Sequence, residues 1–151
     1  MRLHIALVAP VLVAFIASGA ALAAERPSFA GNWVLDTSQS TGAVPEWSGM
    51  QIGQDSRWVR MGKTDKNGRQ VQTLEGECRT DGRFHPVEGG QGGSISCKWD
   101  GSTLVTQEHW DNARNERTIR TMLQPDGTLV QEITASGPAA GGSAHLVWRK
   151  Q

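Results

Sequence analysis

The fold of this chain is decided by the stretch FAGNWVLD, which spans residues 29–36. Trp33 and Leu35 are separated by one residue, so in an extended strand both side chains point to the same face. Gly31 precedes this alternation and lets the backbone bend as it enters a strand. The stretch therefore predicts a short β-strand, beginning at Asn32, that presents an indole and a leucine to one side.

Upstream of this strand, the sequence has the features of a secretory signal peptide. Arg2 precedes an apolar run at residues 3–17, and Ala21-Leu22-Ala23 has the small-x-small form that signal peptidase cleaves. The run is short for a membrane span of about 20 residues. We therefore expect residues 1–23 to be a signal peptide and residues 24–151 to be one domain, periplasmic or secreted, with no stable membrane span.

The mature domain has about 128 residues and is nearly neutral, which bears on its partners. Loss of Arg2 with the signal peptide leaves 14 basic side chains against 15 acidic ones. This balance removes the electrostatic attraction that drives non-specific nucleic-acid binding, so we expect no nucleic-acid partner. A chain of this size can bury one core without a structural metal, and we expect neither a metal nor a cofactor.

Two cysteines, Cys78 and Cys97, remain in the mature chain. In an oxidising compartment they are expected to form an intramolecular disulfide. The bond would close a loop of about 20 residues and stabilise the fold by about 3 kcal/mol in the loop-entropy model. The alternative is a redox or metal-binding pair, but the spacing matches neither C-x-x-C nor a zinc ligand set.

Turn-forming dipeptides punctuate the mature chain at short intervals: Asn67-Gly68, Asp81-Gly82, Asp100-Gly101, Asp111-Asn112 and Asp126-Gly127. These residues tolerate the positive φ of tight hairpins. Short runs rich in Val, Ile, Leu, Thr and Trp lie between them, and no long window has helical periodicity. The expected strands begin at Asn32, Met50, Arg57, Arg69, Gly82, Ser94, Thr103, Glu116, Thr128 and Ala144.

This pattern predicts an all-β domain, a single antiparallel meander of 8–10 strands. A meander of that length leaves two exposed edges unless it closes on itself, so we expect a β-barrel.

Gly31-Asn32-Trp33 near the start and LVWRK at residues 146–150 resemble the pattern of the calycin superfamily, which includes lipocalins, fatty-acid-binding proteins and avidins. In these proteins Gly-x-Trp opens the first strand, and a basic residue of the last strand packs over the tryptophan. The resemblance implies barrel closure at Gly31, Trp33 and Lys150. A cation over an indole contributes about 0.5–2 kcal/mol.

The second half of the chain is similar in strand order and spacing to the last four strands of fatty-acid-binding proteins. The whole mature chain also resembles small exported bacterial lipocalin-like domains. One segment departs from this pattern. Fatty-acid-binding proteins have a helix-turn-helix lid after the first strand, whereas residues 37–48 contain Pro45 with several Gly and Ser residues and predict a loop.

Together, strand alternation and the resemblance predict which residues face a ligand inside the barrel. The expected ligand-binding residues are Trp33, Thr106, Glu108, Trp110, Arg120, Gln131, Leu146 and Trp148.

Three aspects of this set stay open. Ile119, Thr121 and Leu123 form the more apolar face of their strand and would send Arg120 outward, unless a bulge reverses the register. Glu108 needs a partner or water if it is inside, or else it faces solvent. The tryptophans either fill a small barrel or line an aromatic pocket.

The sequence favours binding over catalysis, although it leaves enzyme activity uncertain. It contains neither H-E-x-x-H nor G-x-S-x-G, and no nucleophile–base pair follows from spacing, so we predict no catalytic residues. The favoured function is an exported protein that takes a small apolar or aromatic ligand into the barrel.

The alternative function is an exported inhibitor or interaction module with a secreted hydrolase as its partner. Small bacterial calycin-like inhibitors have a similar Gly-x-Trp start and a disulfide. Such a protein would act through its barrel mouth and its N-terminal segment, here Glu25 to Ser28.

Overall fold

The structure is a computed structural model, and it describes residues 25–71, 76–87 and 92–151. The expected signal peptide at residues 1–23 lies outside the described residues. Within the described ranges there is no helix long and apolar enough to span a membrane.

The described residues form twelve β-strands. They are β1 (Gly31–Leu35), β2 (Thr41–Gly42), β3 (Trp47–Gln54), β4 (Trp58–Asp65), β5 (Gln70–Val71), β6 (Glu77–Arg79), β7 (His85–Pro86), β8 (Ser94–Asp100), β9 (Thr103–Trp110), β10 (Asn115–Leu123), β11 (Leu129–Ser136) and β12 (Ala144–Lys150). Eight strands have five or more residues, and β2, β5, β6 and β7 have two or three. The prediction of an all-β antiparallel meander is confirmed.

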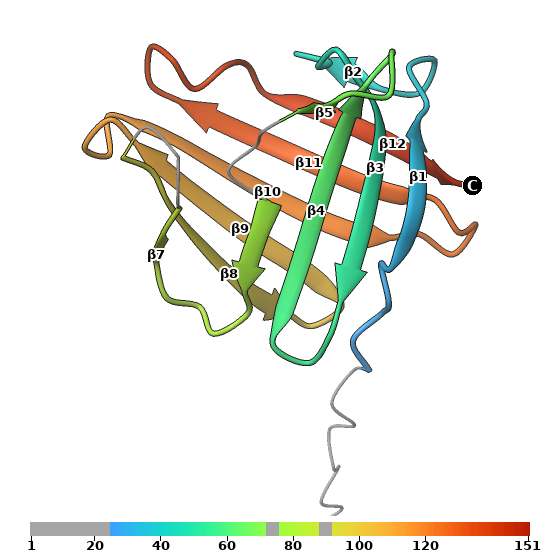
Figure 1. Ribbon diagram of the computed structural model, residues 1–151, viewed down its shortest axis with the longest axis horizontal. Helices are drawn as coiled ribbons and strands as arrows, with labels where there is room; N and C mark the ends of the chain where they lie inside the picture. Colours follow the sequence, from blue (N-terminus) through green and yellow to red (C-terminus); the bar gives the residue numbers. More distant parts are fainter. Residues whose placement is uncertain (1–24, 72–75, 88–91) are drawn as a thin grey trace, which may run out of the picture.

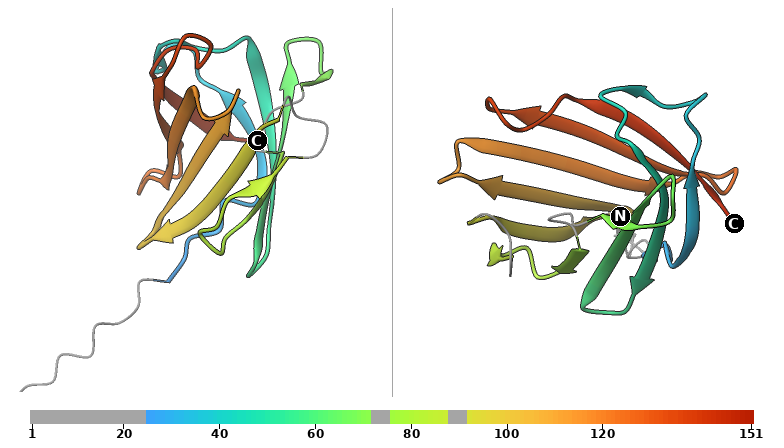
Figure 2. Two further views of the ribbon diagram at one scale, coloured as in Figure 1. Left: turned by 90° about the vertical axis from the view of Figure 1, so that its left-hand side faces the viewer. Right: turned by 45° about the horizontal axis from the view of Figure 1, so that its top comes forward.

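The strands form one curled sheet in the order β5-β4-β3-β1-β12-β11-β10-β9-β8-β7. Strands β1, β3 and β4 form one layer and cross in front of β8–β12 (Figure 1). The side view shows the two layers facing each other (Figure 2). Strand β1 is the corner between the layers, because it pairs with β3 on one edge and with β12 on the other.

The first and last strands meet in the way the resemblance implies. In the β1–β12 ladder Trp33 lies opposite Lys150, and Leu35 lies opposite Trp148. Lys150 Nζ is 5.6 Å from the centroid of the Trp33 ring. Gly31 has a φ of 141°, and a Cβ atom at this position would lie 2.9 Å from Lys150 Cε.

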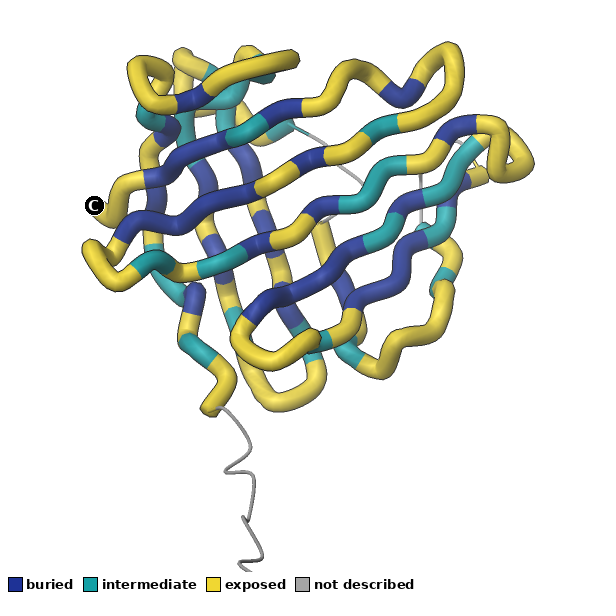
Figure 3. The backbone as a smooth tube through the Cα atoms, turned by 180° about the vertical axis from the view of Figure 1, so that it is seen from behind, coloured by how far each residue is buried: buried dark blue, intermediate teal, exposed yellow. Residues whose placement is uncertain are grey.

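Buried residues recur along the long strands of the curled sheet (Figure 3), and the apolar ones form a single core cluster. Its largest fully buried apolar side chains are those of Phe29, Trp33, Leu104, Ile119, Leu129, Leu146 and Trp148. Phe29 precedes β1 and packs against Trp99, with their ring centroids 5.3 Å apart. Trp33 Nε1 donates a hydrogen bond to the Phe29 carbonyl at 2.9 Å, so the segment before β1 seals this end of the barrel.

The connection between β1 and β3 contains no helix, as residues 37–48 predict. Asp36 organises its first turn by accepting hydrogen bonds from Ser38 and from Arg149 Nε, the latter at 2.6 Å. The hydrogen bond from the Ser38 hydroxyl, followed by that from Arg149, lowers the pKa of the Asp36 carboxyl. Strand β2 then pairs with β12, so a short extended segment lies where fatty-acid-binding proteins have a lid.

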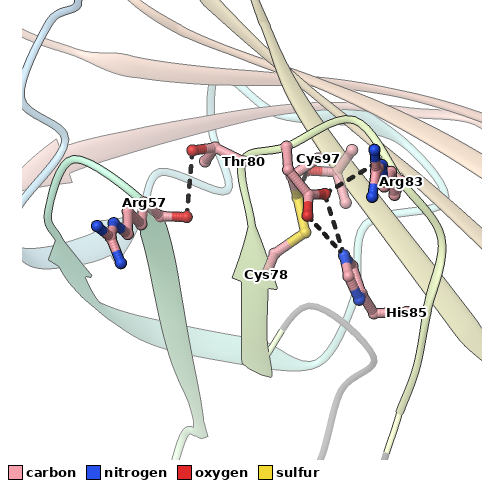
Figure 4. The surroundings of a disulfide bond; sticks show 8 residues. Arg57, Cys78, Thr80, Arg83, His85 and Cys97 are labelled. Atoms are coloured by element: carbon pink, nitrogen blue, oxygen red, sulfur yellow. Dashed lines mark hydrogen bonds and ion pairs between the residues drawn. A yellow bond between two sulfur atoms is a disulfide. The ribbon is translucent and has the colours of Figure 1, made fainter.

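The second corner of the barrel, where β6 lies beside β8, differs from the β1 corner in how its strands are joined. We call this corner the seam, defined as the join between β6 and β8. Strand β6 pairs with β4, and the described residues form no ladder between β6 and β8. The Cys78–Cys97 disulfide joins the two strands instead, which confirms the predicted bridge (Figure 4).

We predict that Gly31→Ala lowers the free energy of unfolding by about 1–3 kcal/mol, because alanine is strained at this φ. The new methyl group would also press on the Lys150 stem. Urea unfolding monitored by tryptophan fluorescence measures the change. Gly53→Ala is the matched control, since a Cβ atom at Gly53 meets nothing within 4 Å. Equal stability of the two variants would contradict this account of the β1–β12 join.

Candidate ligand-binding site

A cavity of about 610 Å³ lies where β4, β5 and β6 face β7 and β8. Pockets that hold small molecules typically measure about 300–1,000 Å³. The cavity is lined by Trp58, Met61, Gly62, Lys63, Gln70, Val71, Gly76, Glu77, Arg79, His85, Pro86, Val87 and Ile95.

The floor of the cavity is apolar and lies beside the disulfide. Met61 on β4 and Ile95 on β8 are both buried and belong to the core. Met61 lies two residues after Val59, which is opposite Cys78 in the β4–β6 ladder. Ile95 lies two residues before Cys97 and is on the same strand face. The cavity therefore extends from the inner face of the barrel to the seam.

Lys63 brings a buried amine to the cavity wall. Its side chain is fully buried, and Nζ lies 4.0 Å from the centroid of the Trp47 ring. A desolvated cation–π contact of this kind contributes about 2 kcal/mol. The indole thus covers one side of the amine and fixes its position between β3 and β4.

The rim of the cavity contains an indole flanked by two arginines. The Cζ atoms of Arg79 and Arg60 lie 4.8 Å and 5.5 Å from the centroid of the Trp58 ring. Arg60 forms ion pairs with Glu77 at 3.4 Å and with Asp55 at 3.5 Å. The Arg79 guanidinium lies at the rim over the Trp58 ring, and it forms no ion pair with the described residues.

His85 lies on the opposite side of the cavity and is held by a turn. Its Nε2 is 3.0 Å from both carboxylate oxygens of Asp81. The backbone N–H of Arg83, followed by His85, lowers the pKa of the Asp81 carboxyl. Figure 4 shows His85 and Arg83 on the β8 side of the disulfide and Arg57 with Thr80 on the β4 side.

Two of the three indoles in the predicted ligand set, those of Trp33 and Trp148, pack in the core. Trp33 and Trp148 are buried almost completely. Trp148 Nε1 donates to Gln131 Oε1 at 3.1 Å, and Gln131 Nε2 donates to Thr121 Oγ1 at 3.4 Å. Leu146, opposite Gln131, is also fully buried. These side chains fill one end of the barrel, and none of them lines the cavity at the seam.

Glu108 faces the interior and is fully buried. Arg117 Nε and Nη2 are each 2.6 Å from its Oε2. Arg117 Cζ also lies 5.7 Å from the centroid of the Trp110 ring. Thr106, two residues before Glu108, has its Oγ1 3.3 Å from Cys97 Sγ. The two strands β9 and β10 are therefore tied together inside the barrel by an ion pair.

Arg120 faces outward, and this corrects its place in the predicted ligand set. The registers of β10 with β9 and β11 run without a bulge, so alternation directs Thr121 inward and Arg120 outward. Arg120 Nη2 lies 3.1 Å from Asp100 Oδ2 on the surface. The arginine that enters the interior from β10 is Arg117, which the same alternation places on the face of Ile119.

The N-terminal segment assigned to the inhibitor alternative is attached to the base of the barrel. Gln54 Nε2 donates to the Pro27 carbonyl at 3.0 Å, and Gln54 Oε1 accepts from the Phe29 N–H at 2.9 Å. Arg26 lies over Trp99, with its Cζ 5.9 Å from the ring centroid. Glu25 and Ser28 are exposed.

No family model matches this sequence, and no curated protein matches it either. Solved structures do resemble it in fold. The fluorescent protein UnaG aligns with a TM-score of 0.57 at 16% identity, covering 82% of this chain and 97% of that one. A mutant of UnaG aligns with a TM-score of 0.55 at 17% identity, covering 82% and 96%. This likeness shows the fold, which is a calycin-like barrel.

Proposed function

We propose that this chain is a binding protein that takes a small ligand with an apolar or aromatic body into the cavity at the seam. The observation that carries the proposal is the cavity itself, whose volume of about 610 Å³ suits a small organic molecule. Its floor is formed by the core residues Met61 and Ile95, while the fully buried indoles of Trp33 and Trp148 do not line it.

The lining fits a ligand with an apolar body and a polar end. Met61, Val87 and Ile95 offer aliphatic surface, and burying a ligand against it contributes about 25 cal/mol per Å² before the costs of association. Trp58 at the rim adds aromatic surface, with the Arg79 guanidinium over its ring. Arg79 beside it offers donors for a polar or anionic group that stays near solvent.

The protein is expected to bind N-phenyl-1-naphthylamine, a neutral aromatic probe that fluoresces in apolar surroundings. Val87→Trp places an indole in the cavity and should weaken this binding by about tenfold or more, measured by fluorescence titration. Val34→Trp is the matched control, because Val34 is 37% exposed and belongs to β1, away from this cavity. Absence of probe binding to the unmodified protein, or equal binding by both variants, would refute the proposal.

We also propose that the chain is exported and loses residues 1–23. Two features support this: the apolar run followed by Ala21-Leu22-Ala23, and a disulfide, which persists in oxidising compartments. N-terminal sequencing of protein from a periplasmic or secreted fraction is expected to begin at Ala24. A chain that keeps Met1 and stays in the cytoplasmic fraction would contradict export.

A further inference from the structure

The seam differs from every other join in the barrel. From β5 through the β1–β12 pair to β7, neighbouring strands are linked by ladders of backbone hydrogen bonds. Between β6 and β8 the described residues have no such ladder. The backbone crosses the seam at residues 80–84, where Gly82 N donates to the Cys97 carbonyl at 2.8 Å. The disulfide spans the seam next to this crossing.

Residues close to both cysteines line the cavity, although neither cysteine does so itself. Glu77 and Arg79 flank Cys78 on β6, and both line the cavity. Ile95 lines it from β8, on the same strand face as Cys97. A change in the separation of β6 and β8 would therefore change the width of the cavity mouth.

Each side of the seam is held by its own ladder. Strand β6 pairs with β4 at Trp58–Arg60, and Thr80 N donates to the Arg57 carbonyl at 2.8 Å. Strand β8 pairs with β9 along its whole length, from Ser94 to Asp100. Breaking the disulfide would leave both ladders intact. At the seam, residues 80–84 and the Gly82 N–Cys97 O hydrogen bond would remain, so β6 could shift from β8 together with the edge of β4 while the barrel stays folded.

We propose that the Cys78–Cys97 disulfide controls the exchange of ligand through the seam. With the bond intact, β6 stays against β8 and ligand leaves slowly. With the bond broken, local opening of β6 becomes easier and ligand leaves and enters faster. This inference rests on the proposed function, because it concerns the rate at which that same cavity exchanges its ligand.

The bond can be removed in two independent ways. A dithiol such as dithiothreitol reduces it by thiol–disulfide exchange, which leaves thiols on Cys78 and Cys97 and converts the reagent to its cyclic disulfide. Alternatively, a double variant with Cys78→Ala and Cys97→Ala never forms the bond. The reagent should have no effect on exchange in this double variant.

The experiment measures the dissociation rate of N-phenyl-1-naphthylamine by stopped-flow displacement. We expect dissociation to be about tenfold faster, or more, in both the reduced protein and the double variant. Gly31→Ala, which keeps the disulfide but weakens the β1–β12 join, is the control for lower global stability. Its dissociation rate should stay near that of the unmodified protein.

The possible outcomes separate this inference from the proposed function. If no form binds the probe, the proposed function fails. If the probe binds but leaves all forms at one rate, or leaves Gly31→Ala equally fast, control by the disulfide is wrong and the binding site stands. Loss of the near-ultraviolet circular dichroism of the tryptophans on reduction would also overturn the inference, because the bond would then hold the whole fold.

Discussion

Strand β1 pairs with β12 on one edge and with β3 on the other, and this double pairing connects the two layers of the barrel. It places Trp33 between Lys150 and Met50, and it places Leu35 opposite Trp148. Because the strand near the start of the domain meets the last one, the apolar faces of both layers share one interior. Without this pairing, no backbone ladder among the described residues would join the layers.

The two corners of the barrel differ in how their strands are joined and in what lies between them. At the first corner, hydrogen bonds and packed indoles give a filled, stable core around Phe29, Trp33 and Trp148. At the second corner, a disulfide replaces the ladder and a cavity replaces the packed side chains. Under the proposed function, stability and ligand uptake are therefore assigned to different corners, and the seam would open locally while the β1–β12 side holds the fold.

Most of the fold could be predicted from short windows of the sequence. Dipeptides such as Asp126-Gly127 mark turns, and alternation marks the long strands, so both follow from short windows of sequence. Strands β2 and β6 were missed because each has only two or three residues and depends on a distant partner. The interior arginine, Arg117, was missed, although it lies on the same strand face as Ile119 and Thr121. The cavity could not be predicted, because it depends on which two strands fail to pair.

Methyl NMR, with the methionines labelled with ¹³C at their methyl groups, shows where the ligand binds. Met61 lines the seam cavity, Met50 lies in the core, and Met122 is on the outward-facing side of β10. Binding at the seam predicts nuclear Overhauser effects between N-phenyl-1-naphthylamine and the Met61 methyl, with none to Met50 or Met122. Contacts to Met50 without contacts to Met61 would place the ligand in the core and contradict the account.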